Sequence, residues 1–227
     1  MLIMGIDEAG RGPVIGPMVL CGLVATEDQE EELRKIKVAD SKTLSPKKRE
    51  ELSEKIEGIA THIIILRIPA HKIDANRKKG INLNQIEAIK MAEIIDMIKP
   101  DKVYIDSPSY NSNKFMEYLS SKLEHKKVEI IAENYADKKY AVVSAASIMA
   151  KVDRDAQIKK LEQEIGEPLG VGYPHDELTI KHLEKIAREN KGKMPRYVRT
   201  TWDTTKQIIK KYEQKGLVGF LQKIGKE

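Results

Sequence analysis

The sequence predicts an α/β fold built around one mixed β-sheet. Three hydrophobic β-type segments come first, at residues 2–6, 14–24 and 63–68, and they predict an antiparallel meander. From residue 81 onward helical and strand patterns alternate, which is typical of parallel strand pairing through helical crossovers. Beyond residue 170 only helical patterns and loops follow. We therefore expect a sheet domain over residues 1–170 and a helical, basic subdomain over residues 171–227 packed on it.

The size and charge of the chain limit its possible functions. With 227 residues, of which 41% are hydrophobic, it can bury the core of one large domain or of a domain with an appendage. The formal net charge is +5, and from Glu184 onward there are 12 Lys or Arg against 5 Asp or Glu. This basic C-terminal part suits a polyanion such as nucleic acid, although a solvated helical surface would have the same composition.

Cys21 is the single cysteine, which rules out an intrachain disulfide and a cysteine metal cluster. It lies in an apolar stretch and is expected to be a small core residue of a protein in the reducing cytoplasm. No apolar run approaches the roughly 20 residues of a membrane helix, and no signal peptide precedes the first strand. We expect a cytoplasmic monomer that does not bind membranes.

The first strand ends in an unusual way. Asp7 and Glu8 directly follow its apolar residues, and the turn Gly10-Arg11-Gly12-Pro13 comes next. Burying an unpaired carboxylate costs several kcal/mol, so two adjacent acids suggest a cation. The glycines leave the backbone free to approach a ligand, and its amides can form a small nest for an anion. A hairpin with two surface acids is the alternative.

The next elements follow from local signals. Residues 27–37 form a charged turn or short helix, and Asp40-Ser41-Lys42 lies in a loop. Ser45 followed by Pro46 predicts the start of a helix over residues 46–59. The later elements are expected in this order: helix 81–98, strand 103–106, helix 114–123, strand 128–132, polar exit 133–137, long helix 138–163, helix 176–190, basic segment 191–200, helix to Gln214 and tail 216–221.

Acidic residues recur where strands end. Asp106 closes the strand at 103–106, and Asp137 lies just before the long helix. The carboxyl ends of parallel strands face one crevice, so these acids are expected to meet Asp7 and Glu8. Gathered carboxylates repel one another unless a cation neutralises them, and oxygen-only ligands favour Mg²⁺ or Mn²⁺. Neighbouring strand residues point to opposite faces, so Asp7 and Glu8 share a metal only if the strand ends or bulges there.

Five ordered motifs carry a family resemblance. Between Met4 and Trp202 the chain resembles type 2 ribonucleases H, ribonuclease HII in particular, and its helical tail resembles the archaeal members. The motifs are Gly5-Ile6-Asp7-Glu8-Ala9-Gly10-Arg11-Gly12-Pro13, Asp40-Ser41-Lys42-Thr43-Leu44, Tyr104-Ile105-Asp106-Ser107, the block from Ala136-Asp137 to Asp155, and Gly172-Tyr173-Pro174.

The resemblance implies a fold, a cofactor and an activity. The fold is a ribonuclease H-like mixed five-stranded sheet flanked by helices, with a helical C-terminal subdomain. Asp7, Glu8, Asp106 and Asp137 would be the catalytic, metal-binding set for Mg²⁺ or Mn²⁺. The expected reaction is endonucleolytic cleavage of the RNA strand of an RNA–DNA hybrid, or incision at a ribonucleotide embedded in duplex DNA. A metal-activated water would leave 5′-phosphate and 3′-hydroxyl ends.

The resemblance also implies substrate contacts. The backbone of Gly10, Arg11 and Gly12 would sense the ribose 2′-hydroxyl, and Tyr173 would pack on the neighbouring deoxyribose. Lys42 and Arg11 would contact phosphates, and Ser41 is a weaker candidate of that kind. The alternatives are a loop anchor for Tyr173 and ordinary surface charges for the two cations. Residues 191–200 serve either nucleic-acid contact or domain packing.

The tail suggests a protein partner. Residues 214–221, from Gln214 to Leu221, resemble the short box with which replication proteins bind the sliding clamp, although Leu221 replaces the second aromatic residue. A short amphipathic helix folded onto its own domain is the alternative.

Two other classes of protein explain less of the sequence. A sugar kinase or actin-like ATPase needs a second glycine-rich phosphate hairpin, and the sequence has neither that hairpin nor a P-loop motif. A non-catalytic nucleic-acid-binding module would explain the basic C-terminal part but not four acids at strand ends.

Overall fold

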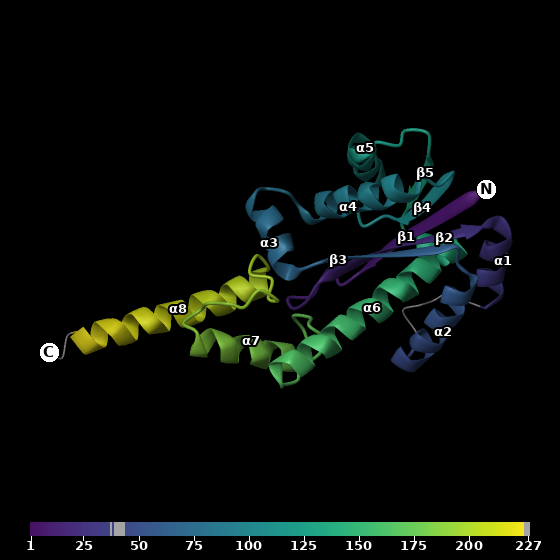
Figure 1. Ribbon diagram of the computed structural model, residues 1–227. Coiled ribbons are helices and arrows are strands. Elements are labelled where there is room, and N and C mark those ends of the chain that lie inside the picture. Colours follow the sequence, from purple (N-terminus) through teal and green to yellow (C-terminus); the bar gives the residue numbers. More distant parts are fainter. Residues whose placement is uncertain (37, 39–43, 225–227) are drawn as a thin grey trace. The chain divides into compact units, whose positions relative to one another are not determined.

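The computed structural model describes residues 1–36, 38 and 44–224, with side chains described as far as residue 213. Its centre is a five-stranded sheet in the order β3-β2-β1-β4-β5 (Figure 1). Strands β1 (Leu2–Ala9), β2 (Met18–Thr26) and β3 (His62–Ile68) pair antiparallel. Strands β4 (Lys102–Asp106) and β5 (Glu129–Glu133) extend β1 in parallel. The predicted meander with added parallel strands is confirmed.

Local sequence signals explain most helix boundaries. The Ser45 hydroxyl caps α2 by accepting a hydrogen bond from the Lys48 N–H at 3.3 Å, with Pro46 as the first helical residue. Asn82 and Gln85 form a capping box at the start of α4. The helices are α1 (Glu27–Lys35), α2 (Pro46–Ile59), α3 (Ala70–Lys78), α4 (Leu83–Ile98), α5 (Ser112–Lys122), α6 (Ala141–Ile165), α7 (Glu177–Glu189), α8 (Asp203–Ile224) and the 3₁₀ turn η1 (Ala136–Lys138).

The structure departs from the sequence prediction in three places. Strand β2 begins at Met18, because residues 11–17 form a loop instead of its first part. Helix α3 was not expected, since it buries only Ala70, Ile73 and Asp74 and shows little apolar periodicity. Helix α8 continues past Gln214 to Ile224, because a glycine costs a helix only about 1 kcal/mol and does not forbid it.

The chain forms two compact units. The sheet unit comprises residues 1–10, 18–68 and 81–156, and the helical unit comprises residues 11–17, 69–80 and 157–227. The helical unit thus includes the loop between β1 and β2. The expected division into residues 1–170 and 171–227 remains a prediction.

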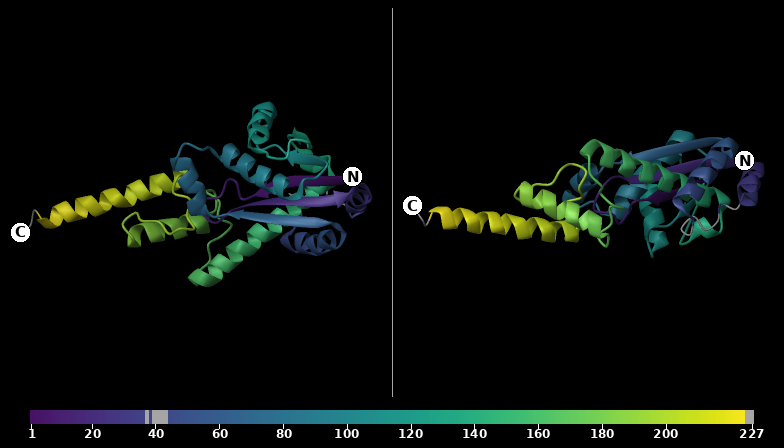
Figure 2. Two further views of the ribbon diagram at one scale, coloured as in Figure 1. Left: turned by 45° about the horizontal axis from the view of Figure 1, so that its top comes forward. Right: turned by 90° about the horizontal axis from the view of Figure 1, so that it is seen from below.

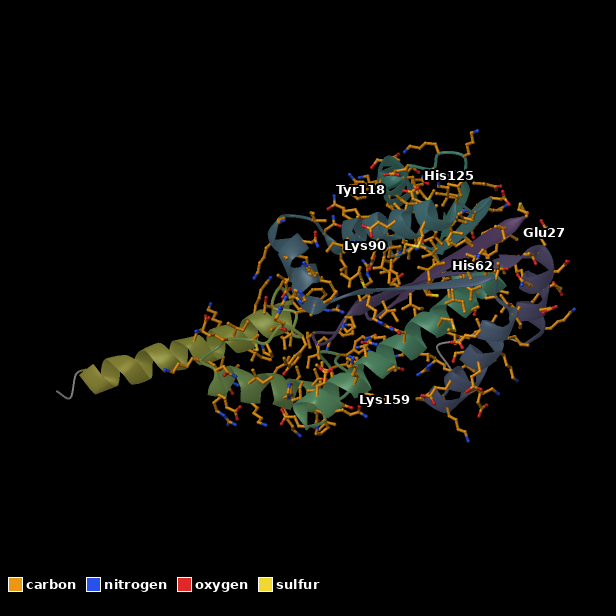
Figure 3. All side chains as sticks on the ribbon, viewed as in Figure 1. Glu27, His62, Lys90, Tyr118, His125 and Lys159 are labelled. Atoms are coloured by element: carbon orange, nitrogen blue, oxygen red, sulfur yellow. The ribbon has the colours of Figure 1, made fainter. Side chains whose placement is uncertain are left out.

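In the sheet unit, helices cover both faces of the sheet. Helices α4 and α5 lie on one face, and α1, α2 and the first part of α6 lie on the other (Figure 1). Side chains of Lys90, Tyr118 and His125 mark the α4 and α5 side (Figure 3). Odd-numbered residues of β1, such as Ile3 and Ala9, pack with α6 in a large buried apolar cluster. The even-numbered residues of β1 therefore face α4.

Two glycines allow helices to approach the sheet closely. A Cβ atom on Gly5 would lie 2.3 Å from the backbone carbon of Val142 in α6. A Cβ atom on Gly22 would lie 2.5 Å from the Cγ2 atom of Ile94 in α4. At Gly5 the obstacle is backbone, which cannot move aside like a side-chain end. Helix α6 consequently rests directly on β1.

The helical unit has its own core. This core draws its side chains from the β1–β2 loop, α6 and the loop after it, α7, the segment before α8, and α8 itself. Its buried members are Val14, Ile15, Ile158, Leu169, Leu183, Ala187, Val198 and Ile208. An isolated antiparallel bridge joins Ile15 to Val198. Helix α8, the last helix in Figure 2, closes the chain. In the part of the chain that the structure describes, no helix is long and apolar enough to cross a membrane.

Replacing Gly5 with Ala should destabilise the protein, because the added methyl group meets the Val142 backbone. We expect a loss of about 2 kcal/mol or more in the free energy of unfolding, measured by urea denaturation. Gly58→Ala is the matched control: Gly58 lies in α2 with nothing within 4 Å of an added Cβ. That variant should be neutral or more stable by about 0.5–1 kcal/mol. Equal stabilities for the two variants would contradict the close packing of α6 on β1.

Candidate active site

Asp7 and Glu8 lie within a regular part of β1. The strand continues to Ala9, and Asp7 and Glu8 pair with Cys21 and Leu20 of β2 without interruption. The strand therefore neither ends nor bulges at the two acids, and their side chains leave it on opposite faces. Asp7 points to the α6 face and is buried, whereas Glu8 points to the other face and is half-buried.

The strand register aligns a row of side chains across the α6 face. Ile6 pairs with Ile105, so the next residues, Asp7 and Asp106, follow side by side on neighbouring parallel strands. On its other side Asp106 pairs with Glu133 of β5. Paired residues of a sheet point to the same face, so Cys21, Asp7, Asp106 and Glu133 form one row.

Asp137 joins this corner through the turn that follows β5. Tyr135 adopts a left-handed conformation with φ of 64°, which turns the chain sharply into η1. One carboxylate oxygen of Asp106 accepts a hydrogen bond from the Ala136 N–H at 3.1 Å. Because Ala136 directly precedes Asp137, this bond ties two of the predicted acids to the same turn. Asp137 is buried.

Helix α6 supplies a polar contact to Asp7. The Ser147 hydroxyl hydrogen-bonds the Asp7 carboxylate, and the Glu8 N–H donates to the same carboxylate at 2.7 Å. From Val142 to Ser147 the helix advances about 7.5 Å, and from Gly5 to Asp7 the strand advances about 6.6 Å. The contact of α6 with Gly5 thus places Ser147 level with Asp7. The sequence by itself assigns Ser147 no role of its own, although it lies within the motif block from Ala136 to Asp155.

The electrostatic environment of Asp7 disfavours its negative charge. Burial raises the pKa of Asp7 well above its usual range, and the charges of Glu8 and Asp106 raise it further. The hydrogen bonds from Ser147 and from the Glu8 N–H lower the pKa by a smaller amount. Burial, with Asp7 and Asp153 nearby, also raises the pKa of the Cys21 thiol. A proton or a cation at Asp7 would relieve this repulsion.

The oxygen ligands at this corner fit a hard divalent cation. Oxygen-only ligand sets suit Mg²⁺ and Mn²⁺, whereas zinc sites include nitrogen or sulfur ligands. Among the residues that the structure describes, no three Asp, Glu, His or Cys side chains are gathered closely enough to hold a metal ion as they stand. A bound cation would let the acids come closer together, because carboxylates alone repel one another.

A small cavity lies beside Asp137. Its volume is about 70 Å³, and it is lined by Arg34, Val38, Asp137, Lys138, Lys139, Tyr140, Ala141 and Ser144. The Ser144 hydroxyl donates a hydrogen bond to the Val38 carbonyl. Val38 is the last described residue before the predicted phosphate contacts, Ser41 and Lys42, which lie outside the described residues.

In the helical unit, the structure brings Gly12 and Tyr173 together. A Cβ atom on Gly12 would lie 3.4 Å from the Cε1 atom of Tyr173, so the glycine lies against the tyrosine ring. The Gly172 carbonyl accepts a hydrogen bond from the Val14 N–H at 2.8 Å, which fixes the two loops to each other. Gly12 is exposed and Tyr173 is half-buried. The glycine turn and the Gly-Tyr-Pro loop therefore lie against each other within the helical unit.

A mixed sheet with Asp7 and Asp106 side by side at the carboxyl ends of neighbouring parallel strands suits a metal-dependent nuclease of the ribonuclease H type. The family model described as Ribonuclease HII matches residues 4–205. The protein belongs to the ribonuclease HII family, whose members cleave the RNA strand of RNA–DNA hybrids. The predicted family and fold are thereby confirmed.

Individual relatives agree over nearly their whole length. Ribonuclease HII of Methanosarcina acetivorans is 42% identical over 222 residues, which cover 95% of this chain and 99% of the relative. The crystal structure of the ribonuclease H2 from Pyrococcus horikoshii OT3 superposes with a TM-score of 0.85 at 40% identity, covering 94% of this chain and 99% of that one. The structure of a PCNA:RNase HII complex from Archaeoglobus fulgidus superposes with a TM-score of 0.79 at 37% identity. The match covers 89% of this chain and 96% of that chain.

Asp7→Asn should stabilise the protein in EDTA at neutral pH, because it removes a buried negative charge. The raised native pKa means that the folded state binds the extra proton above the unfolded pKa of about 3.9. Stability therefore falls as the pH rises through the window between the two pKa values. The advantage of Asp7→Asn in Tm should be at least about 2 °C at neutral pH and should shrink as the pH falls toward 4.

With Mg²⁺ or Mn²⁺ added, the wild-type protein should become more stable than Asp7→Asn. The cation should raise the Tm of the wild-type protein and raise that of Asp7→Asn much less, since ligand binding stabilises only the folded state that binds it. Glu54→Gln, which alters an exposed carboxylate on α2, is the control and should follow the wild type in both conditions. The assignment of Asp7 as a buried metal ligand would be refuted if Asp7→Asn were less stable than the wild type in EDTA. It would also be refuted if the cation raised the Tm of both proteins equally.

Proposed function

We propose that this protein is an endonuclease that cuts the RNA strand of RNA–DNA hybrids and also incises duplex DNA at embedded ribonucleotides. Its products would carry 5′-phosphate and 3′-hydroxyl ends. The observation that carries the proposal is the alignment of Asp7 with Asp106 at the carboxyl ends of parallel strands. Asp106 is also hydrogen-bonded to the turn that bears Asp137.

Of the four acids, Asp7, Asp106 and Asp137 would together bind Mg²⁺ or Mn²⁺, and Glu8 would act from the opposite face of β1. Asp7, Asp106 and Asp137 form the centre of the proposed set, because the pKa of Asp7 responds to Asp106 and Asp106 contacts the Asp137 turn. Glu8 leaves the strand on the opposite face and adds its negative charge next to Asp7. When bound, the cation supplies an activated water nucleophile and neutralises charge on the leaving oxygen.

The chain's own residues would select the phosphate that is cut. The Gly10-Arg11-Gly12 turn follows the acids of β1 within a few residues, so its amides would contact the ribose 2′-hydroxyl beside the scissile phosphate. The Tyr173 ring, which lies against Gly12, would pack on the deoxyribose of the next nucleotide. Arg11, Ser41 and Lys42 would contact phosphates.

Activity on a DNA duplex that carries one ribonucleotide tests this function. The wild-type protein should incise it only with Mg²⁺ or Mn²⁺, and mass spectrometry should identify a 5′-phosphate end. Asp106→Asn and Asp137→Asn should lower the rate by about 100-fold or more, because loss of a metal ligand removes several kcal/mol of transition-state stabilisation. Glu54→Gln should cut like the wild type. Incision without a divalent cation, or full activity in the Asp variants, would disprove the proposal.

We also propose a sliding clamp as a protein partner. The relative from Archaeoglobus fulgidus was solved as a PCNA:RNase HII complex. In this chain the clamp-like box, residues 214–221, is part of the last helix, α8. The structure describes the backbone of these residues but not their side chains.

Deleting residues after Lys215 tests the partner. The truncated protein should lose binding to an archaeal sliding clamp in a pull-down and should keep its rate on the single-ribonucleotide duplex, because the deletion leaves all the proposed site residues in place. A lower Tm together with lost nuclease activity would instead show that the tail is a structural helix. Retained clamp binding would place the contact elsewhere.

A further inference from the structure

The glycine turn of the helical unit is held by its carbonyl groups. Arg199 is fully buried, and its guanidinium donates from Nη1 to the Arg11 carbonyl at 3.0 Å and from Nε to the Gly16 carbonyl at 3.1 Å. Trp202 donates from its indole Nε1 to the Gly12 carbonyl at 3.1 Å. Three carbonyls of the loop at residues 11–17, which contains the glycine turn, are thus bound by two side chains from the segment before α8.

The segment that carries Arg199 is itself held in place by neighbouring side chains. The Trp202 ring lies 4.9 Å from the Arg199 guanidinium carbon and 4.7 Å from that of Arg77. Asp74 of α3 accepts hydrogen bonds from the backbone N–H and hydroxyl groups of Thr200 and Thr201, at 2.6 to 3.1 Å. The residues that follow Arg199 therefore have a defined backbone, which limits where the guanidinium can lie.

Only one of the three bound carbonyls belongs to a peptide group that has an N–H. Gly12 and Gly16 are each followed by a proline, which carries no backbone hydrogen. The remaining peptide group joins Arg11 to Gly12. It is trans, so its N–H points in the direction opposite to its carbonyl. Because the Arg11 carbonyl points to Arg199, the Gly12 N–H points away from Arg199.

We propose that Arg199 is a positioning residue for ribose recognition, which it controls by fixing the direction of the Gly12 N–H. This inference rests on the proposed function of the glycine turn. Lysine cannot replace Arg199 in this role, because one ammonium group does not reproduce a planar fork that reaches two carbonyls along fixed directions. Arg199 itself is buried and does not contact the nucleic acid.

The inference is tested by binding rather than by cleavage. The measured quantity is the ratio of two dissociation constants in EDTA, for an all-DNA duplex and for the same duplex with one ribonucleotide. In the wild type this ratio should exceed 1, because only the ribonucleotide offers a 2′-hydroxyl. Arg199→Lys and Arg199→Gln should lower the ratio by about threefold or more, toward 1, the effect of losing one hydrogen bond. Thermal melts of each variant check that it is folded.

Two comparison variants isolate the peptide argument. Trp202→Phe removes the hydrogen bond to the Gly12 carbonyl, whose peptide has no N–H, and should change the ratio by less than about twofold. Arg188→Lys changes an exposed arginine on α7 and should leave the ratio unchanged. A general loss of stability would weaken binding of both duplexes equally and would not move the ratio.

The possible outcomes are distinct. If folded Arg199 variants keep the wild-type ratio, or if Trp202→Phe lowers it as much as they do, the positioning role is wrong. If neither Arg199 variant folds, Arg199 serves stability and the inference fails. If the wild-type protein itself binds both duplexes equally and does not incise the ribonucleotide, the proposed function fails and the test of Arg199 has no basis.

Discussion

The arrangement of the sheet unit depends on one electrostatic constraint, the gathering of carboxylates in a place with little water. Asp7 is buried beside Asp106 and next to Glu8, and each of these circumstances raises its pKa. The unit holds Asp7 there by strand register on one side and by α6 on the other. Gly5 is essential to this packing, since any larger residue would push α6, and with it Ser147, away from the strand.

Substrate selection uses a different physical device. The turn after β1 belongs to the helical unit, and there the backbone is the functional group. A backbone amide can recognise a hydroxyl only if the surrounding structure sets its direction, and in this turn a buried guanidinium binds the carbonyl on the other side of the same peptide. Phosphodiester cleavage would use acidic side chains held by the sheet unit, whereas ribose recognition would use a backbone amide held by the helical unit. The two tasks therefore depend on different parts of the fold, although Asp7 and Gly12 are close in sequence.

Much of the fold could be predicted from the sequence because the signals are local. The Ser45-Pro46 helix start and the alternation of helix and strand after residue 81 follow from capping and periodicity. The sequence predicts that the second strand begins at residue 14, because Val14 and Ile15 are apolar, whereas β2 begins at Met18. Both apolar residues are buried in the core of the helical unit instead, and burial against a distant segment leaves no periodic signal.

The sequence by itself determined the family, the four acids as candidates and the glycine turn, because each is a short run of residues with a chemical requirement of its own. Only the tertiary structure decided that Asp7 and Glu8 leave the strand on opposite faces, since that depends on a regular register with β2 through Ala9. It also decided between the two roles open for Arg199, which is buried and packs within the protein. A basic residue in a basic segment has the same sequence pattern whether it faces solvent or binds carbonyls 183 and 188 positions away.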